Sequence, residues 1–220
     1  MTDRLILTLG IFGGTGNEGQ GLALRWARAG YHVIIGSRTI DKAERVAAEL
    51  NEELGEELIE GMENEAAATL CDIGVLTVPY SAHTPTLESL KGKLKGKVLI
   101  DVTVPLDPSN VDVVKMPAAG SAAQEAQAIL GDDCYVVAAF QNISHLHLRQ
   151  DGPVPCEVLV CGDSDAARNQ VLELVKSAGL DGWDAGVLAN AAVVEGLTSI
   201  LIGINKRYKI KNAGFRITGK

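Results

Sequence analysis

Three glycines near the N-terminus have the spacing of a phosphate-binding turn. Gly14, Gly16 and Gly19 form the pattern GxGxxG between an apolar run and a helical pattern. In that setting the first glycine makes a tight turn, the second lets the backbone approach a pyrophosphate, and the third lets the helix pack closely on the strand. The helix N-terminus at Asn17 and Glu18 would present unpaired N–H groups to phosphates. The pattern predicts a dinucleotide site; in the alternative reading the glycines only shape a turn.

The end of the next apolar run distinguishes between two dinucleotides. An NAD site usually has an acidic residue about 20 positions beyond the glycines, bonded to the ribose 2′-hydroxyl. This chain has Gly36, Ser37 and Arg38 there, and Lys42 follows one helical turn later. A hydroxyl and a guanidinium suit a 2′-phosphate, because arginine grips phosphate through paired, charge-assisted hydrogen bonds. We therefore predict NADP(H) rather than NAD(H), unless Arg38 is only a solvated loop charge.

The sequence gives little support for a metal site. The cysteines form no CxxC pair, so buried, reduced thiols are expected of Cys71, Cys134, Cys156 and Cys161. His145 and His147 would share a face of an extended segment, but two ligands are too few, and loop or pocket-lining roles are expected. The motifs of hydrolases and zinc proteases are also missing from the sequence. We predict no metal site.

Alternating strands and helices are expected to position these residues. The predicted strands are residues 5–12, 33–35, 73–78, 98–102 and 134–140, and the predicted helices are residues 17–29, 41–54, 65–70, 84–90 and 121–130. Such alternation implies an α/β fold with a Rossmann-type doubly wound parallel sheet. A strand at 157–161 and helices at 165–178 and 187–208 would form a small C-terminal α/β segment. We place the domain boundary between residues 1–150 and 151–220.

Composition and charge exclude several classes of protein. The chain has 220 residues, 46% hydrophobic and 22% charged, which suits a single globular domain with a small appendix. The net charge of −8 disfavours a general nucleic-acid partner. The apolar N-terminal stretch breaks at Gly13-Gly14, so no export signal and no membrane span are predicted there, and a cytoplasmic location is expected.

The last predicted helix is apolar nearly all round. A membrane span would have to accommodate Asn190, Glu195 and Asn205, so a buried helix at a subunit or domain interface is expected. Small residues allow a partner helix to approach closely, which predicts a homodimer built partly on Ala189, Ala191, Ala192, Gly196 and Gly203.

Several segments together resemble one family, the coenzyme F420-dependent NADP oxidoreductases. The similarity spans nearly the whole chain, and its more specific parts are residues 136–144 and 212–218. The segments that carry it are residues 13–17, 36–38, 77–79, 101–105, 120–123, 136–144 and 212–218. The resemblance implies hydride transfer between C4 of the nicotinamide and C5 of the F420 deazaflavin, with the two rings stacked in one cleft.

The resemblance also implies which residues bind the two coenzymes. The implied NADP contacts are Thr15, Gly16, Asn17, Glu18, Ser37, Arg38 and Lys42, with Tyr80 and Thr84 beside the nicotinamide. The implied deazaflavin contacts are Gln141, Asn142, Ile143, Ser144 and His145. Some family members have histidine where this chain has Gln141 and Asn142, so these side chains could protonate the deazaflavin or only hydrogen-bond to it. Hydride exchange between coenzymes requires orientation and a dry cavity rather than a protein nucleophile, and we assign no catalytic residue.

Three other functions fit the same motifs. One is an NADP-dependent dehydrogenase or imine reductase, which would need an acid–base residue such as Tyr80, His83 or His145. A second is a flavin-using reductase. A third is a non-catalytic NADP(H)-sensing protein, because a fold does not fix a function.

A basic cluster lies at the C-terminus of this acidic chain. Its members are Lys206, Arg207, Lys209, Lys211, Arg216 and Lys220. One hypothesis is that it attracts the phosphate and carboxylate tail of F420. The alternatives are a frayed basic tail or a subunit contact.

Overall fold

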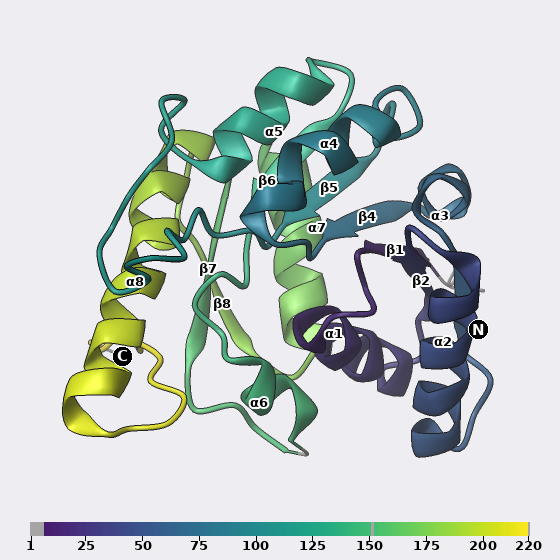
Figure 1. The fold of residues 1–220 in the computed structure, drawn as a ribbon, viewed down its shortest axis with the longest axis horizontal. Helices are drawn as coiled ribbons and strands as arrows, with labels where there is room; N and C mark the ends of the chain where they lie inside the picture. Colours follow the sequence, from purple (N-terminus) through teal and green to yellow (C-terminus); the bar gives the residue numbers. More distant parts are fainter. Residues whose placement is uncertain (1–6, 151, 220) are drawn as a thin grey trace.

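A single mixed sheet organises the computed structural model, which describes residues 7–150 and 152–219 (Figure 1). Its strands are β1 (Thr8–Phe12), β2 (His32–Ser37), β3 (Ile59–Glu63), β4 (Ile73–Leu76), β5 (Val98–Asp101), β6 (Tyr135–Ala138), β7 (Glu157–Gly162) and β8 (Asp181–Asp184). Their order is β3-β2-β1-β4-β5-β6-β7-β8, and β1 to β6 run parallel. The predicted doubly wound Rossmann-type sheet is confirmed; residues 5 and 6 of the predicted first strand lie outside the described residues.

Helices cover both faces of the sheet. They are α1 (Asn17–Arg28), α2 (Ile40–Leu54), α3 (Asn64–Leu70), α4 (Tyr80–Leu90), α5 (Ala122–Leu130), α6 (His145–Arg149), α7 (Asp165–Ser177) and α8 (Ala191–Tyr208), with a 3₁₀ turn at Leu188–Asn190. One hydrophobic cluster joins the sheet to α1, α2, α6 and α7, and the other joins it to α3, α4, α5 and the start of α8. Strands covered on both faces explain the continuous apolar runs of the sequence.

The elements missing from the prediction are short or polar. The edge strands β3 and β8 have the sequences IEGME and DGWD, which lack an apolar run. The five-residue helix α6 is too short for a periodic pattern. Helix α4 begins at Tyr80 rather than Thr84, because Pro85 lies inside the helix and not in its first turn.

The C-terminal segment extends the main sheet. Strand β7 pairs antiparallel with β6, and β8 pairs parallel with β7. The chain after α8 then returns to β7, where the backbone N–H of Glu157 donates to the carbonyl of Phe215 at 3.1 Å. The sheet is thus continuous across residue 150, and the boundary between two domains at that residue stays a prediction.

Helix α8 carries the apolar stretch considered above as a membrane span. Residues Leu188–Tyr208 are, among the described helices, the one stretch long and apolar enough to cross a membrane, and 44% of its most apolar window is buried inside the protein. Glu195 in its middle is fully buried. Its carboxylate accepts hydrogen bonds from the backbone of Ala122 and Ala123 at 2.7 and 3.1 Å. These contacts fit a helix packed on its own domain.

Candidate active site

A cavity of about 790 Å³ opens at the carboxyl ends of β1, β2, β4 and β5. This is where the strand order reverses, the usual ligand position in such sheets. The predicted residues that line it are Thr15, Gly16, Asn17, Glu18, Ser37, Arg38, Lys42 and Tyr80. Thr84 is exposed and does not line it, whereas Ala82 and Thr86 of the same helix do.

The three motif glycines differ in the space around them. A methyl group on Gly14 would lie 2.7 Å from the carbonyl of Ile11, and one on Gly19 would lie 2.6 Å from the Cα of Gly14. On Gly16 its nearest neighbour would be the carbonyl of Gly13 at 3.7 Å. Gly14 and Gly19 are therefore required by packing, whereas Gly16 leaves open space at the cavity wall.

The same turn leaves donors for a bound anion. Gly16 is the N-cap of α1 and provides no side-chain hydrogen bond to the helix. The first N–H groups of a helix have no partner within it and attract phosphate. At the far end of the cavity, Arg38 and Lys42 are exposed, and within the described residues neither forms an ion pair.

A second cavity of about 370 Å³ lies between the loop after β6 and helix α8. All five residues predicted to contact the deazaflavin line it: Gln141, Asn142, Ile143, Ser144 and His145. The loop begins at Phe140, whose φ of 71° is unusual for a residue with a side chain. From α8, Thr198 donates to the carbonyl of Gln141 at 2.8 Å and accepts from the Asn142 side chain at 2.9 Å.

Two residues that line this second cavity each have an unpaired acceptor atom. Gln141 donates to the carbonyl of Asp101 at 2.7 Å, but its Oε1 is buried without a partner among the described residues. Asn142 donates to the carbonyl of Val194 at 2.9 Å, and its Oδ1 is likewise buried and unpaired. Buried polar atoms are nearly always hydrogen-bonded, so these two oxygens can accept from a ligand.

The two cavities adjoin each other. Both are lined by Glu18, Val102, Val104 and Leu106. Three of these residues belong to the segment after β5, and they are apolar. A ligand in either cavity would therefore contact the same wall, which is apolar except for Glu18.

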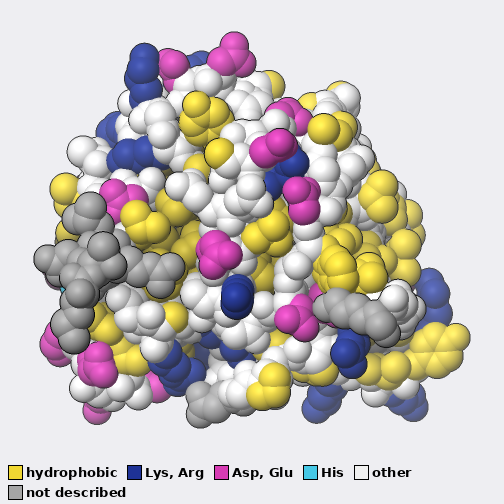
Figure 2. Space-filling model, turned by 180° about the vertical axis from the view of Figure 1, so that it is seen from behind, with side chains coloured by type: hydrophobic (Ala, Val, Ile, Leu, Met, Phe, Trp, Pro, Cys, Tyr) yellow, Lys and Arg dark blue, Asp and Glu magenta, His cyan; other side chains and the backbone are white. Residues whose placement is uncertain are grey.

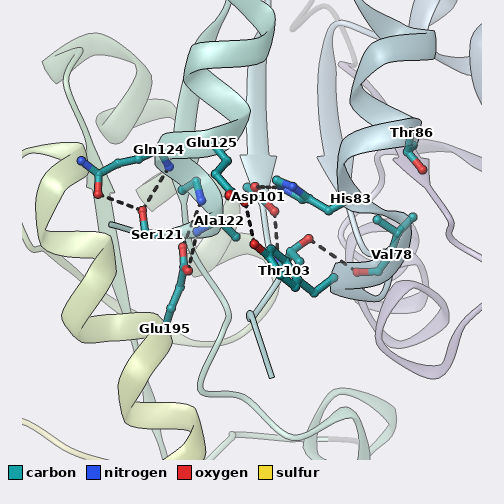
Figure 3. Close-up of polar contacts among 12 residues, drawn as sticks. Val78, His83, Thr86, Asp101, Thr103, Ser121, Ala122, Gln124, Glu125 and Glu195 are labelled. Atoms are coloured by element: carbon teal, nitrogen blue, oxygen red, sulfur yellow. Dashed lines mark hydrogen bonds and ion pairs between the residues drawn. The ribbon is translucent and has the colours of Figure 1, made fainter. Parts of the chain in front are cut away.

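A buried hydrogen-bond network holds that segment in place (Figure 3). His83 Nε2 lies 2.8 Å from Asp101 Oδ2, and both side chains are fully buried. The other carboxylate oxygen of Asp101 accepts from the backbone N–H of Thr103 at 3.0 Å. Since Thr103 lines the first cavity and Gln141 lines the second, Asp101 connects the two. Asp101 is not among the predicted site residues, because a single carboxylate at the end of an apolar strand does not indicate its partners.

Tyr80, His83 and His145 were the acid–base candidates for a dehydrogenase or imine reductase, and the structure places each of them differently. His83 lines neither of the two cavities, so it cannot reach a substrate there. Tyr80 donates to Glu125 at 2.9 Å, and burial together with that carboxylate raises the pKa of Tyr80 to about 12. His145 lines the second cavity, whereas His147 contacts the backbone carbonyl of Asn212 at 3.1 Å. The two histidines lie on helix α6 and not on an extended segment, so they do not share a face. Among the described residues no group of three potential metal ligands lies together.

Removing the carboxylate of Asp101 is expected to destabilise the fold. In Asp101→Ala, His83 and the N–H of Thr103 lose their partner in a fully buried site. The free energy of unfolding should fall by about 3 kcal/mol, and Tm by roughly 10 °C. Thermal melts of Asp133→Ala provide the control, because Asp133 pairs with Lys95 on the surface and should contribute under about 1 kcal/mol. Equal melting temperatures for the two variants would contradict a structural role for Asp101.

Comparisons with known proteins identify relatives of this chain. Residues 8–105 match the family model described as NADP oxidoreductase, coenzyme F420-dependent. The chain is 42% identical to the F420-dependent NADP reductase of Methanothermobacter marburgensis over 96% of this chain and 98% of that protein. It is 39% identical to the F420-dependent NADP reductase of Methanocaldococcus jannaschii, with the same coverage.

A solved structure has the same fold. A protein of Arthrobacter sp. FB24, provisionally named an F420-dependent NADP reductase, superposes with a TM-score of 0.81 at 24% identity, over 97% of this chain and 100% of that chain. That similarity supports the fold, and the sequence identity to the two Methanothermobacter and Methanocaldococcus reductases over nearly their whole length shows the family. The chain belongs to the family of F420-dependent NADP reductases.

Proposed function

We propose that this protein is an oxidoreductase that transfers a hydride between NADP(H) and coenzyme F420. One observation carries the proposal: two cavities adjoin and share the wall formed by Glu18, Val102, Val104 and Leu106. Direct hydride exchange requires the donor and acceptor carbons to meet in a site that excludes water.

The residues of the first cavity fit NADP(H). The free N–H groups at the start of α1 suit a pyrophosphate, and Gly16 leaves room for it. Arg38 and Lys42 supply positive charge beside Ser37, at the place where a 2′-phosphate would lie. We propose these residues as NADP(H) contacts, and we propose Tyr80 as a contact of the nicotinamide ring. Thr84 was predicted to contact the same ring; it does not line the cavity, and its role stays a proposal.

The residues of the second cavity fit a deazaflavin. The unpaired oxygens of Gln141 and Asn142 can accept hydrogen bonds from a ring N–H, and Ile143 provides an apolar contact. When bound, the two coenzymes supply the hydride donor and the hydride acceptor. The protein orients them, and the apolar segment 102–106 keeps water from the point where they meet.

A spectroscopic assay tests the proposal. Mixing the protein with NADP⁺ and reduced F420 should restore the absorbance of the oxidised deazaflavin, and NAD⁺ should replace NADP⁺ poorly. A flavin-using reductase would instead turn over with reduced FMN. A protein that binds NADP(H) and restores no absorbance would be a dehydrogenase of other substrates or a sensor of the nucleotide, and the proposal would be wrong.

We further propose that the protein is a homodimer joined through α8. The predicted reason needs correction: Gly196 and Gly203 pack against Val114 and Asp112 of the chain's own loop and do not face a partner. A different face of α8 is apolar and outward. Its members at helical spacing are Val193, Leu197, Ile200 and Ile204. Figure 2 shows apolar side chains gathered along the edge on which α8 lies, with basic side chains at its lower end.

Introducing a charge on that face is expected to separate the subunits. Val193 is 76% exposed and Ile200 is 49% exposed, so Ile200→Asp should fold normally and elute as a monomer. Light scattering of the wild type and the variant measures the masses. A monomeric wild type would contradict the dimer.

We also propose a cytoplasmic location and a role for the basic C-terminus in binding F420. A cytoplasmic location is supported by the four cysteines, which are all buried and free. For the basic C-terminus, the second cavity is lined by Asn205, just before the cluster, and by Ala213, between Lys211 and Arg216, which supports a role near F420. Lys206 pairs with Asp112 at 2.8 Å, so its charge is partly compensated, and Lys220 lies outside the described residues.

A further inference from the structure

Glu18 is the ionisable residue on the wall that the two cavities share. Its Oε1 atom is buried and accepts no hydrogen bond within the described residues. We propose that Glu18 holds a proton while the nicotinamide is reduced and releases it when the nicotinamide becomes the oxidised cation. This inference rests on the proposed function, and it makes Glu18 the residue that couples a proton to hydride transfer.

The surroundings of Glu18 leave its charge uncompensated. The other ionisable groups that line the same two cavities are Arg38, Lys42, Tyr80 and His145, and helix α6, which packs against α1, also carries His147 and Arg149. Tyr80 is bonded to Glu125, and Arg149 is paired with Glu53 at 2.9 Å. Burial is the cause that raises the pKa of Glu18, to about 8. The neutral acid therefore dominates near pH 7.

Oxidation of the nicotinamide changes this balance. The reduced ring is neutral, and the oxidised ring is a cation. A positive charge in the cavity that Glu18 lines would favour the carboxylate and lower its pKa. The phosphates near the helix N-terminus act in the opposite direction, but they are the same in both nucleotides. The difference between NADPH and NADP⁺ therefore reports the effect of the ring charge on Glu18.

The stoichiometry of the reaction is consistent with this role. NADPH, F420 and one proton give NADP⁺ and reduced F420. The hydride leaves the nicotinamide with both electrons of its C–H bond and forms the new C–H bond on the deazaflavin. The proton leaves the O–H bond of the Glu18 carboxyl for the reduced deazaflavin, and the carboxylate remains beside the cationic ring. Water restores the proton once NADP⁺ has dissociated.

Proton exchange on nucleotide binding tests the inference without turnover. Titration calorimetry in buffers of different ionisation enthalpy measures the protons released or taken up. Near pH 7, where free Glu18 is protonated, NADP⁺ binding should release a proton and NADPH binding should not. Near pH 9, where free Glu18 is ionised, NADPH binding should take up a proton and NADP⁺ binding should not. The affinity for NADP⁺ relative to NADPH should rise with pH. The total rise should be up to about tenfold for each unit by which the pKa of Glu18 in the NADPH complex exceeds its pKa in the NADP⁺ complex.

Variants assign the proton to Glu18. Glu18→Gln keeps the shape and stays neutral, so the proton difference between the two nucleotides and its pH dependence should disappear; Glu18→Leu should behave in the same way. Glu52→Gln removes an exposed carboxylate of α2 and should match the wild type. A wild type with equal proton exchange for both nucleotides, or a Glu18→Gln protein that keeps the difference, would overturn the inference while leaving the proposed function intact. Failure to bind either nucleotide would overturn both.

Discussion

Replacing Arg38 with aspartate is expected to raise the Kd for NADPH by about 100-fold, with little change for NADH. The guanidinium lines the nucleotide cavity, is exposed and has no ion-pair partner within residues 7–150 and 152–219. Losing two charge-assisted hydrogen bonds and adding a like charge beside a 2′-phosphate should cost about 3 kcal/mol, which is roughly 100-fold in Kd. The new carboxylate can instead bond to the ribose hydroxyl of NADH.

The control for this variant is Arg45→Asp. Arg45 is exposed on the same helix as Lys42 and does not line the cavity, so the same change of charge should leave both affinities nearly unchanged. Fluorescence titrations with both nucleotides give the four Kd values needed. A preference for NADPH that survives in Arg38→Asp would show that the 2′-phosphate binds elsewhere.

Adding one methyl group at Gly16 is expected to weaken nucleotide binding severely in a protein that folds normally. In the structure a Cβ there has its nearest neighbour at 3.7 Å, so packing tolerates it. The methyl would occupy the space through which a pyrophosphate reaches the N–H groups of α1. Loss of two such hydrogen bonds to a charged group should weaken NADP(H) binding at least about 100-fold.

Gly19→Ala separates this effect from damage to the fold. A methyl on Gly19 would lie 2.6 Å from the Cα of Gly14 and 2.8 Å from Thr77 Oγ1, so that variant should lose both stability and binding. Melting curves and nucleotide titrations of the two variants make the comparison. If Gly16→Ala binds NADPH like the wild type, the pyrophosphate does not lie against this turn.

The sequence predicts the fold wherever local patterns and packing agree. Strands β1, β2, β4, β5 and β6 are apolar because both of their faces are covered, so each is visible as an apolar run. The edge strands β3 and β8 are held by pairing to a neighbour rather than by their own apolar residues, and their sequences do not show it. The predicted start of α4 at Thr84 was wrong, because a proline usually lies in the first turn of a helix and Pro85 lies further inside this one.

The candidate site likewise has a part that local sequence predicts and a part that depends on contacts between distant segments. The glycine motif and Arg38 belong to one continuous strand–turn–helix–strand unit. Because this unit has a fixed geometry, the spacing of these residues in the sequence predicts their relative positions in the fold. The shared wall of the cavities depends on Glu18 meeting segment 102–106, which is distant in sequence. The partners His83 and Asp101 are likewise 18 positions apart and meet only through the packing of α4 on the sheet. Contacts of this kind have no local signal.

Deuterium transfer tests the central claim most directly. NADPH labelled at the transferring C4 position is mixed with the protein and oxidised F420, and the reduced F420 is analysed by mass spectrometry. Hydride transfer between coenzymes in adjoining, dry cavities requires the label to appear in the reduced deazaflavin without exchange with water. Unlabelled reduced F420, or oxidised F420 that stays unchanged while NADPH binds, would contradict it.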